Sequence, residues 1–193
     1  MIPEKGKQLF SLLYRGRRIA RRYLVTNGFD GALAMLGLMT GFYVSGTKEL
    51  GVAIDACLGA AIALLISGFS SAYLSETAER KHELRELEQA LLVDLEESNY
   101  GEASHYLPFL IASVNGLSPL FFSFLIISPL FLFYHGIEWP CSPFLVAIFI
   151  ALFCIFLLGV YLGKISRQFW LWAGLRTVLI AMILVVIILL FDI

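Results

Sequence analysis

Charged residues are scarce in this chain of 193 residues, and several long stretches contain none. Lys, Arg, Asp and Glu together make up 15% of the sequence, whereas a soluble domain has about 25%. Residues 148–163 and 177–191 carry no charge, and 59% of all residues are hydrophobic. This composition excludes a soluble globular domain. Because roughly 20 apolar residues cross the hydrocarbon core of a bilayer, the sequence predicts an integral membrane protein.

Cysteine is also rare, and its spacing excludes two kinds of site. Cys57, Cys141 and Cys154 form no C-x-x-C pair, so we expect neither a disulfide framework nor a zinc site. The sequence contains no nucleophile–base pair and no phosphate-cradling loop, so we do not expect an enzyme. We expect no cleaved signal peptide either, because the first apolar stretch is long and no small-residue cleavage site precedes a soluble domain.

Five apolar stretches are present, and they define the expected fold. The expected spans are residues 27–46, 52–73, 106–134, 143–163 and 172–191. The fold class is therefore all-α integral membrane, with five transmembrane helices and a long cytoplasmic acidic helix between the second and third. The expected domains are an amphipathic N-terminal helix (1–25), transmembrane helices 1 and 2 (26–74), the acidic metal-binding helix (75–104) and transmembrane helices 3 to 5 (105–193).

The positions of Lys and Arg predict the orientation of the chain in the membrane. Only Lys48 falls in the two loops that follow spans one and three. The other thirteen lie before span one, between spans two and three, or around the junction of spans four and five: Lys5, Lys7, Arg15, Arg17, Arg18, Arg21, Arg22, Arg80, Lys81, Arg85, Lys164, Arg167 and Arg176. The positive-inside rule then predicts a cytoplasmic N-terminus and acidic helix, and a C-terminus outside.

The segment 75–98 is rich in Glu, Leu, Arg, Lys and Ala and has no Pro or Gly, which favours a helix that continues from span two. At 100° per residue, six carboxylates fall within one arc of about 80°. They are Glu76, Glu79, Glu83, Glu86, Asp94 and Glu97. Like charges such as Glu79 and Glu83 destabilise a helix by about 0.2–0.5 kcal/mol per pair.

Two interpretations of this carboxylate stripe remain open. It is either the solvated face of a helix that packs through its leucines, or a site for a hard cation, since divalent metals take several oxygen ligands. His82 adds a possible nitrogen ligand. It follows Glu79 in a Glu79-x-x-His82 spacing that helical bundles use to bind iron. We favour metal binding, because leucine packing would bring such helices and their carboxylates together.

Asp30 is an ionisable residue inside span one, where such groups are costly and commonly functional. It shares a helix face with Gly37 and Gly41, whose spacing lets another helix approach closely. Two structural roles compete with a functional one. Asp30 could cap a helix N-terminus, or it could pair with Arg176 at the same depth. Met35 and Met39 point away from Asp30, and we expect them to pack in the core.

Further polar groups lie in spans two and three. Pro119 cannot donate to the carbonyl of Asn115, so Asn115 offers two oxygens in mid-membrane, where polar groups need a cavity or a partner. Asp55 lies near the outer end of span two. Asp30, Asn115 and Asp55 together suggest a hydrophilic route for a cation, although a kinked packing helix would look similar.

Three motifs in this order resemble the vacuolar iron transporter family. "GFDGALAMLGLMTG" around Asp30 resembles the first span of that family. "YLS" at 73–75 matches the end of its second span, and "GLSPL" at 116–120 resembles its proline-containing third span. The arrangement of five spans with an acidic insert covers roughly residues 25–191. Counted back from "YLS", the second-span glutamate of the family falls on Ala60 and its methionine on Gly68.

The resemblance implies a homodimer that exports Fe²⁺, or a related divalent metal such as Mn²⁺, from the cytosol by proton antiport. It also implies that glutamates of the insert bind metal and that Asp30 lines the path. The expected partners are the lipid bilayer, divalent metal ions, protons and a second copy, with no nucleic acid. The membrane would be the cell membrane of a prokaryote or a vacuolar-type membrane of a eukaryote. The alternative is a non-transporting metal sensor or scaffold whose acidic helix recruits a partner.

Overall fold

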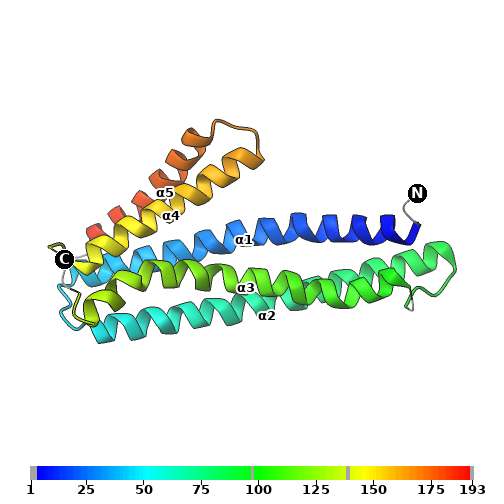
Figure 1. Ribbon diagram of the computed structural model, residues 1–193, viewed down its shortest axis with the longest axis horizontal. Coiled ribbons are helices and arrows are strands. Elements are labelled where there is room, and N and C mark those ends of the chain that lie inside the picture. Colours follow the sequence, from blue (N-terminus) through cyan, green and yellow to red (C-terminus); the bar gives the residue numbers. More distant parts are fainter. Residues whose placement is uncertain (1–3, 97, 138–139, 192–193) are drawn as a thin grey trace. The chain divides into compact units, whose positions relative to one another are not determined.

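The computed structural model describes residues 4–96, 98–137 and 140–191, and the regular elements within those ranges are all α-helices. In chain order they are α1 (Glu4–Val44), α2 (Leu50–Leu91), α3 (Asn99–Tyr134), α4 (Pro143–Ile165) and α5 (Trp170–Phe191), as Figure 1 shows. The predicted all-α class is confirmed for the described part of the chain.

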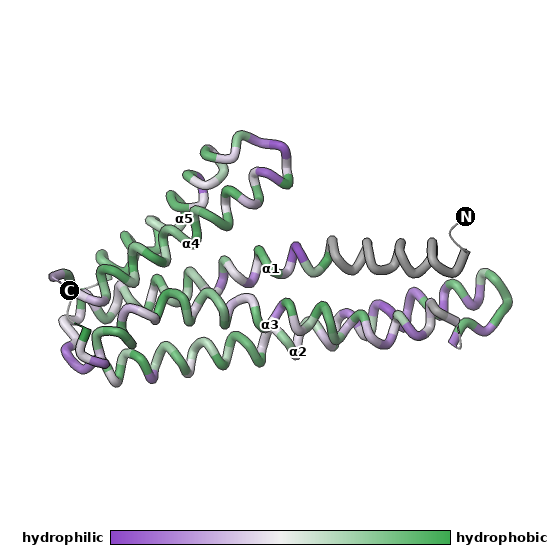
Figure 2. Tube along the Cα trace, in the orientation of Figure 1, coloured by the Kyte–Doolittle hydropathy of each residue, from purple (hydrophilic) through white to green (hydrophobic). Residues whose placement is uncertain are grey.

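Four of these helices, α2 to α5, are long and apolar enough to cross a membrane. They contain the predicted spans 52–73, 106–134, 143–163 and 172–191, and Figure 2 shows their hydrophobic stretches. The predicted first span lies in α1, which is not among the four helices found by length and composition. Asn27, Asp30 and several glycines lower its hydropathy. That span remains a prediction.

The chain divides into two compact units, and α1, α2 and α3 each contribute a segment to both. The first unit comprises Met1–Leu24 and Leu65–Leu117, and the second comprises Val25–Leu64 and Ser118–Ile193. Ten of the fourteen Lys and Arg residues and ten of the fifteen Asp and Glu residues belong to the first unit. The acidic segment therefore shares its unit with a balancing set of basic residues.

Side chains from all five helices build the hydrophobic core of the second unit. Met35 and Met39 of α1 are fully buried there, as the sequence predicted. Small residues bring α4 and α5 together. The Thr177 hydroxyl donates to the Ile155 carbonyl at 3.1 Å, and a Cβ on Gly159 would collide with that hydroxyl. All three cysteines are free, and Cys57 and Cys154 are buried.

The N-terminal segment is not a separate helix. It was expected to end at residue 25, but α1 continues without a break from Glu4 to Val44. The boundary between the two units falls at almost the same place, between Leu24 and Val25. The charged half and the apolar half of α1 thus belong to one continuous helix.

The predicted acidic helix is wrong at its C-terminal end, because α2 stops at Leu91 and not near Ser98. Leu92 adopts a left-handed backbone with φ 53°. The Glu88 carboxylate accepts a hydrogen bond from the Leu95 N–H at 3.1 Å. Ser98 then caps α3, since its hydroxyl accepts bonds from the N–H groups of Tyr100 and Gly101. These local side-chain bonds outweigh the helix propensity of the segment.

We expect Leu92→Gly to stabilise the protein by about 1 kcal/mol, because glycine removes the cost of a left-handed side chain. Leu92 is 90% exposed, so little packing is lost. Its neighbour Leu91 is the matched control. Leu91 is the last residue of α2 and does not have a left-handed backbone, so Leu91→Gly should lower stability, by up to about 1 kcal/mol. Thermal unfolding in mild detergent measures both, and shifts of the same sign would contradict the expectation.

Candidate functional site

The first-span and third-span motifs meet in the second unit. A Cβ on Gly28 would lie 2.9 Å from the Ser118 hydroxyl, and a Cβ on Gly31 would lie 2.7 Å from the Pro119 Cα. Gly28 therefore lets α1 approach side chains of α3, and Gly31 lets it touch the α3 backbone at Pro119, where the helix has lost a hydrogen bond. Asp30 lies between the two glycines and is exposed.

Gly31→Ala should destabilise the second unit, by about 1–3 kcal/mol, because the added methyl group collides with backbone that cannot move aside. Gly59 is the matched control, since a Cβ there meets nothing within 4 Å. Gly59→Ala should leave stability unchanged or raise it by up to about 1 kcal/mol. Thermal unfolding of the purified variants compares the two, and equal effects would contradict a close α1–α3 contact.

The two structural roles considered for Asp30 do not apply to the single chain. Asp30 cannot cap a helix, because α1 begins at Glu4, far upstream. It makes no ion pair with Arg176 in the described part of the structure; the Arg176 guanidinium lies over the Trp172 ring, 5.4 Å from its centre. Asp30 forms no hydrogen bond or ion pair with another described residue. A carboxylate in an apolar stretch without a protein partner is a candidate functional group.

Asn115 lies in the first unit and holds α2 and α3 together. Its side-chain amide is buried and donates to the Gly68 carbonyl at 2.6 Å. Gly68 and Gly116 allow this approach, since a Cβ on Gly68 would lie 3.2 Å from the Asn115 carbonyl oxygen. The resemblance to the vacuolar iron transporter family would put a methionine at Gly68, counted back from "YLS". The close crossing of α2 and α3 leaves no room for that side chain here.

Asp55 is exposed on α2 and belongs to the second unit, as does Asp30. It lies one and a half turns after the start of α2, whereas Asp30 lies nearly four turns before the end of α1. At 1.5 Å per residue, the two carboxylates differ in their distance from the α1–α2 loop by about 13 Å. This difference argues against a single site made of both carboxylates.

A basic side chain of the same helix, Arg80, lies within the carboxylate stripe. Arg80 is 3% exposed, and its guanidinium lies 2.6 Å from a Glu83 carboxylate oxygen and 3.5 Å from one of Glu76. The Tyr23 hydroxyl donates to Glu76 and the Tyr100 hydroxyl to Glu83, each at 3.4 Å. We call these five residues the Arg80 network. It links α1, α2 and α3 within the first unit.

The other predicted metal ligands do not gather into one site. Glu79 is exposed, and Glu86 lies 3.4 Å from the ring of His82. Asp94 lies beyond the end of α2 and accepts a hydrogen bond from the Glu96 N–H at 2.9 Å. Glu97 lies outside the described residues. No group of three His, Cys, Asp or Glu side chains in the described part of the chain could hold a metal ion.

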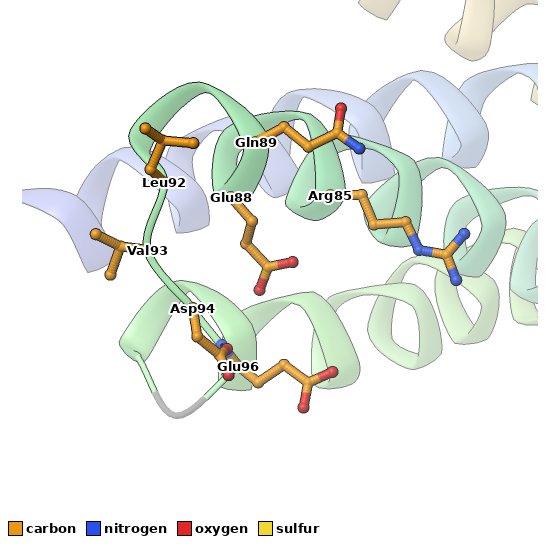
Figure 3. Close-up of a pocket in the computed structure, with 7 residues that line it drawn as sticks. All are labelled: Arg85, Glu88, Gln89, Leu92, Val93, Asp94 and Glu96. Carbon is orange, nitrogen blue, oxygen red and sulfur yellow. The ribbon is translucent and has the colours of Figure 1, made fainter.

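An open hollow of about 510 Å³ lies where α2 turns towards α3. Figure 3 shows Glu88 facing the turn that carries Asp94 and Glu96, with Arg85 on the next turn of α2. The hollow is lined by Arg85, Glu88, Gln89, Leu92, Val93, Asp94 and Glu96. Because Glu88 and Asp94 both accept backbone hydrogen bonds, these carboxylates serve to shape the turn.

The sequence analysis did not predict the Arg80 network, although the sequence places three of its five residues on one helix face. Arg80 follows Glu76 by four residues and precedes Glu83 by three, which places all three on one helix face. The two tyrosines come from distant parts of the chain, so spacing along α2 could not reveal them.

Comparison with known proteins gives one similar sequence. The chain is 33% identical over 160 residues to the uncharacterized protein MJ0645 of Methanocaldococcus jannaschii, covering 81% of this chain and 80% of the archaeal one. No family model matches the chain. No solved structure matches it either.

Proposed function

We propose that this chain, which belongs to the same family as the uncharacterized archaeal protein MJ0645, transports a divalent transition metal, Fe²⁺ or Mn²⁺, out of the cytosol by proton antiport. One observation carries the proposal. Asp30 is a carboxylate with no ion pair or hydrogen bond in the described residues, within the apolar half of α1. Two short motifs that resemble the vacuolar iron transporter family converge beside it.

The proposed role of Asp30 is to bind the metal ion on its way through the membrane and to take a proton on the return step. A carboxylate suits both tasks, since it is an oxygen ligand for divalent cations and a proton acceptor. Asp55 would serve as a second carboxylate further along the route. Asn115 would contribute a carbonyl oxygen, because its side-chain N–H group already donates to Gly68.

The carboxylates of α2 would capture metal on the cytoplasmic side. Glu79 and Glu86 are the exposed members and are open to an incoming cation. Glu76 and Glu83 are held by Arg80, so they would reach a metal only after that network opens. This assignment places the N-terminus and the acidic part of α2 in the cytoplasm, in accord with the distribution of Lys and Arg.

A second copy would supply the ligands that one chain lacks. An isologous contact doubles every carboxylate that it brings near the two-fold axis. Gly41 is suited to such a contact, since a Cβ there would meet nothing within 4 Å in the single chain. Gly37 and Gly41 share the face of α1 that carries Asp30.

We expect Gly41→Leu to convert a dimer into a monomer that is still folded. Leucine fits the open space around Gly41 in one chain, but it would separate two helices packed through glycine. Size-exclusion chromatography with light scattering, in mild detergent, measures the mass of the variant. Gly59→Leu is the control, because Gly59 is equally open but lies on α2. A Gly41→Leu protein that remains a dimer would rule out this interface.

Transport is tested with the full chain reconstituted into liposomes that contain a pH-sensitive dye. A proton gradient should drive uptake of Fe²⁺ or Mn²⁺, and addition of either metal should in turn move protons. Mg²⁺ serves as the control metal and should give a much smaller signal. Metal binding without any metal-dependent proton flux would refute the transport proposal.

A second function is favoured by the Arg80 network, which ties two of the six proposed metal ligands into the packing of the first unit. In this case the protein would be a membrane-bound metal sensor or scaffold, and the exposed acidic side of α2 would recruit a partner. The same liposome experiment separates the two functions. A sensor would bind Fe²⁺ or Mn²⁺ without moving either across the membrane.

A further inference from the structure

Three cations surround the turn between α4 and α5 and have no acidic partner among the described residues. They are Lys164, Arg167 and Arg176, and all three are exposed. We call them the turn cluster. Figure 2 shows this hydrophilic turn between two hydrophobic helices. Because α4 and α5 are both apolar enough to span a membrane, the turn lies at a membrane surface.

The side chain of Arg176 is directed towards the turn. Arg176 lies almost two turns into α5, and its guanidinium is stacked 5.4 Å from the centre of the Trp172 ring, one turn earlier. Side chains on a helix lean towards its N-terminus, and a long cationic side chain near the end of a span extends to the interface. The charge of Arg176 therefore joins the two cations at the end of the helix pair.

The ends of α4 and α5 are in contact at this point, which keeps the cluster together. A Cβ on Gly163 would lie 2.6 Å from the Ala173 Cβ and 3.3 Å from the Trp170 Cα. Lys164 follows Gly163 directly, and Arg167 lies in the turn itself. The cluster is thus built on two packed helices and not on a long loop.

Arg167 adopts a backbone conformation that usually belongs to glycine. Its φ is 54°, and the turn around it is closed by the Gln168 N–H, which donates to the Gly163 carbonyl at 3.0 Å. This is the pattern of a helix C-terminus that ends on a left-handed residue, most often glycine. An arginine at this position carries a conformational cost that glycine would not have.

We propose that the turn cluster binds the phosphate of an anionic phospholipid headgroup. Charge complementarity identifies the ligand, since three cations without an acidic partner converge on one end of two apolar helices. The exposed rings of Phe169, Trp170 and Trp172 surround the cluster, and tryptophan is enriched at the level of lipid headgroups. Basic groups at such a surface attract anionic lipids. The lipid replaces the carboxylate partner that Arg176 does not find among the described residues.

The test is native mass spectrometry of the full chain with bound lipid, using phosphatidylglycerol and phosphatidylcholine as probes. The wild type should retain phosphatidylglycerol in preference to phosphatidylcholine. Lys164→Gln combined with Arg167→Gln should weaken phosphatidylglycerol binding about tenfold or more, because each basic residue near the headgroups contributes to the attraction. Lys48→Gln, in the loop between α1 and α2, is the control and should bind as the wild type does.

Arg167→Gly separates lipid binding from folding. Glycine suits the left-handed turn, so this variant should unfold at the same temperature as the wild type, or higher, in an uncharged detergent. It should still bind less phosphatidylglycerol. If Arg167→Gly and the double variant bind phosphatidylglycerol as the wild type does, the proposal is wrong. Competition by inorganic phosphate alone, at the same concentration as the lipid, would also overturn it, since the site would then recognise a free anion.

Discussion

Asp30→Asn is expected to abolish metal-dependent proton flux while the protein still folds and assembles. Asparagine keeps the size of the side chain and some of its hydrogen bonding, but it can neither carry the negative charge that binds the cation nor accept the returning proton. Folding should survive, because Asp30 is exposed and forms no ion pair with Arg176. The loss of its charge therefore leaves no buried cation without a partner.

The measurement compares Fe²⁺ uptake and proton movement in liposomes, together with the yield of assembled protein. Glu49→Gln is the matched control, since Glu49 is an exposed carboxylate at the start of α2 and has no proposed role in transport. It should transport as the wild type does. Full transport by Asp30→Asn would remove Asp30 from the route. A variant that misassembles and is rescued by Arg176→Gln would instead indicate a pair of these two residues in the assembled protein.

Arg80→Met is expected to have the largest effect on stability, a loss of about 3 kcal/mol or more. The substitution leaves two carboxylates without their cation, and the side chain of Glu76 is only 9% exposed. Removal of one partner from a buried ion pair typically costs about 3–5 kcal/mol, because the remaining charge stays desolvated. The exposed Arg85 on the same helix is the control. Arg85→Met should change stability by no more than about 0.5 kcal/mol.

A triple variant tests the cause of this loss. Glu76→Gln and Glu83→Gln, added to Arg80→Met, replace the charged network by neutral groups of similar volume, which is often harmless. The triple variant should regain much of the stability that Arg80→Met loses, measured as the midpoint of thermal unfolding in detergent. If Arg80→Met unfolds at the wild-type temperature, the network does not hold the first unit together.

The Arg80 network also affects the metal binding that we propose for the acidic segment. In the sequence, six carboxylates formed one stripe, with Lys81 and Arg85 on the far side of the helix. In the structure, Arg80 neutralises part of this stripe, and the end of α2 at Leu91 separates Asp94 from it. Glu79 and Glu86 remain as the exposed carboxylates on α2 within the stripe. We therefore expect the stripe in one chain to bind a divalent cation weakly, and more tightly once a second copy adds its own carboxylates.

The sequence by itself determined the class of the protein and the positions of most helices. Long apolar stretches without charge are sufficient to identify α2 to α5 as helices able to span a membrane, since length and hydropathy are local properties. The core positions of Met35 and Met39 followed from helical periodicity, which is local as well. The three free cysteines also agree with the absence of a paired spacing in the sequence.

Only the tertiary structure decided which polar groups meet. The contact of Gly31 with Pro119, the bond from Asn115 to Gly68 and the tyrosines of the Arg80 network all join residues that lie far apart in the chain. The partner of Arg176 is a further example. A similar depth in the membrane suggested Asp30, but in the structure the Arg176 guanidinium lies over the Trp172 ring. Periodicity places a residue on a face of its own helix. Which other helix covers that face depends on packing between distant segments, and no local pattern in the sequence encodes it.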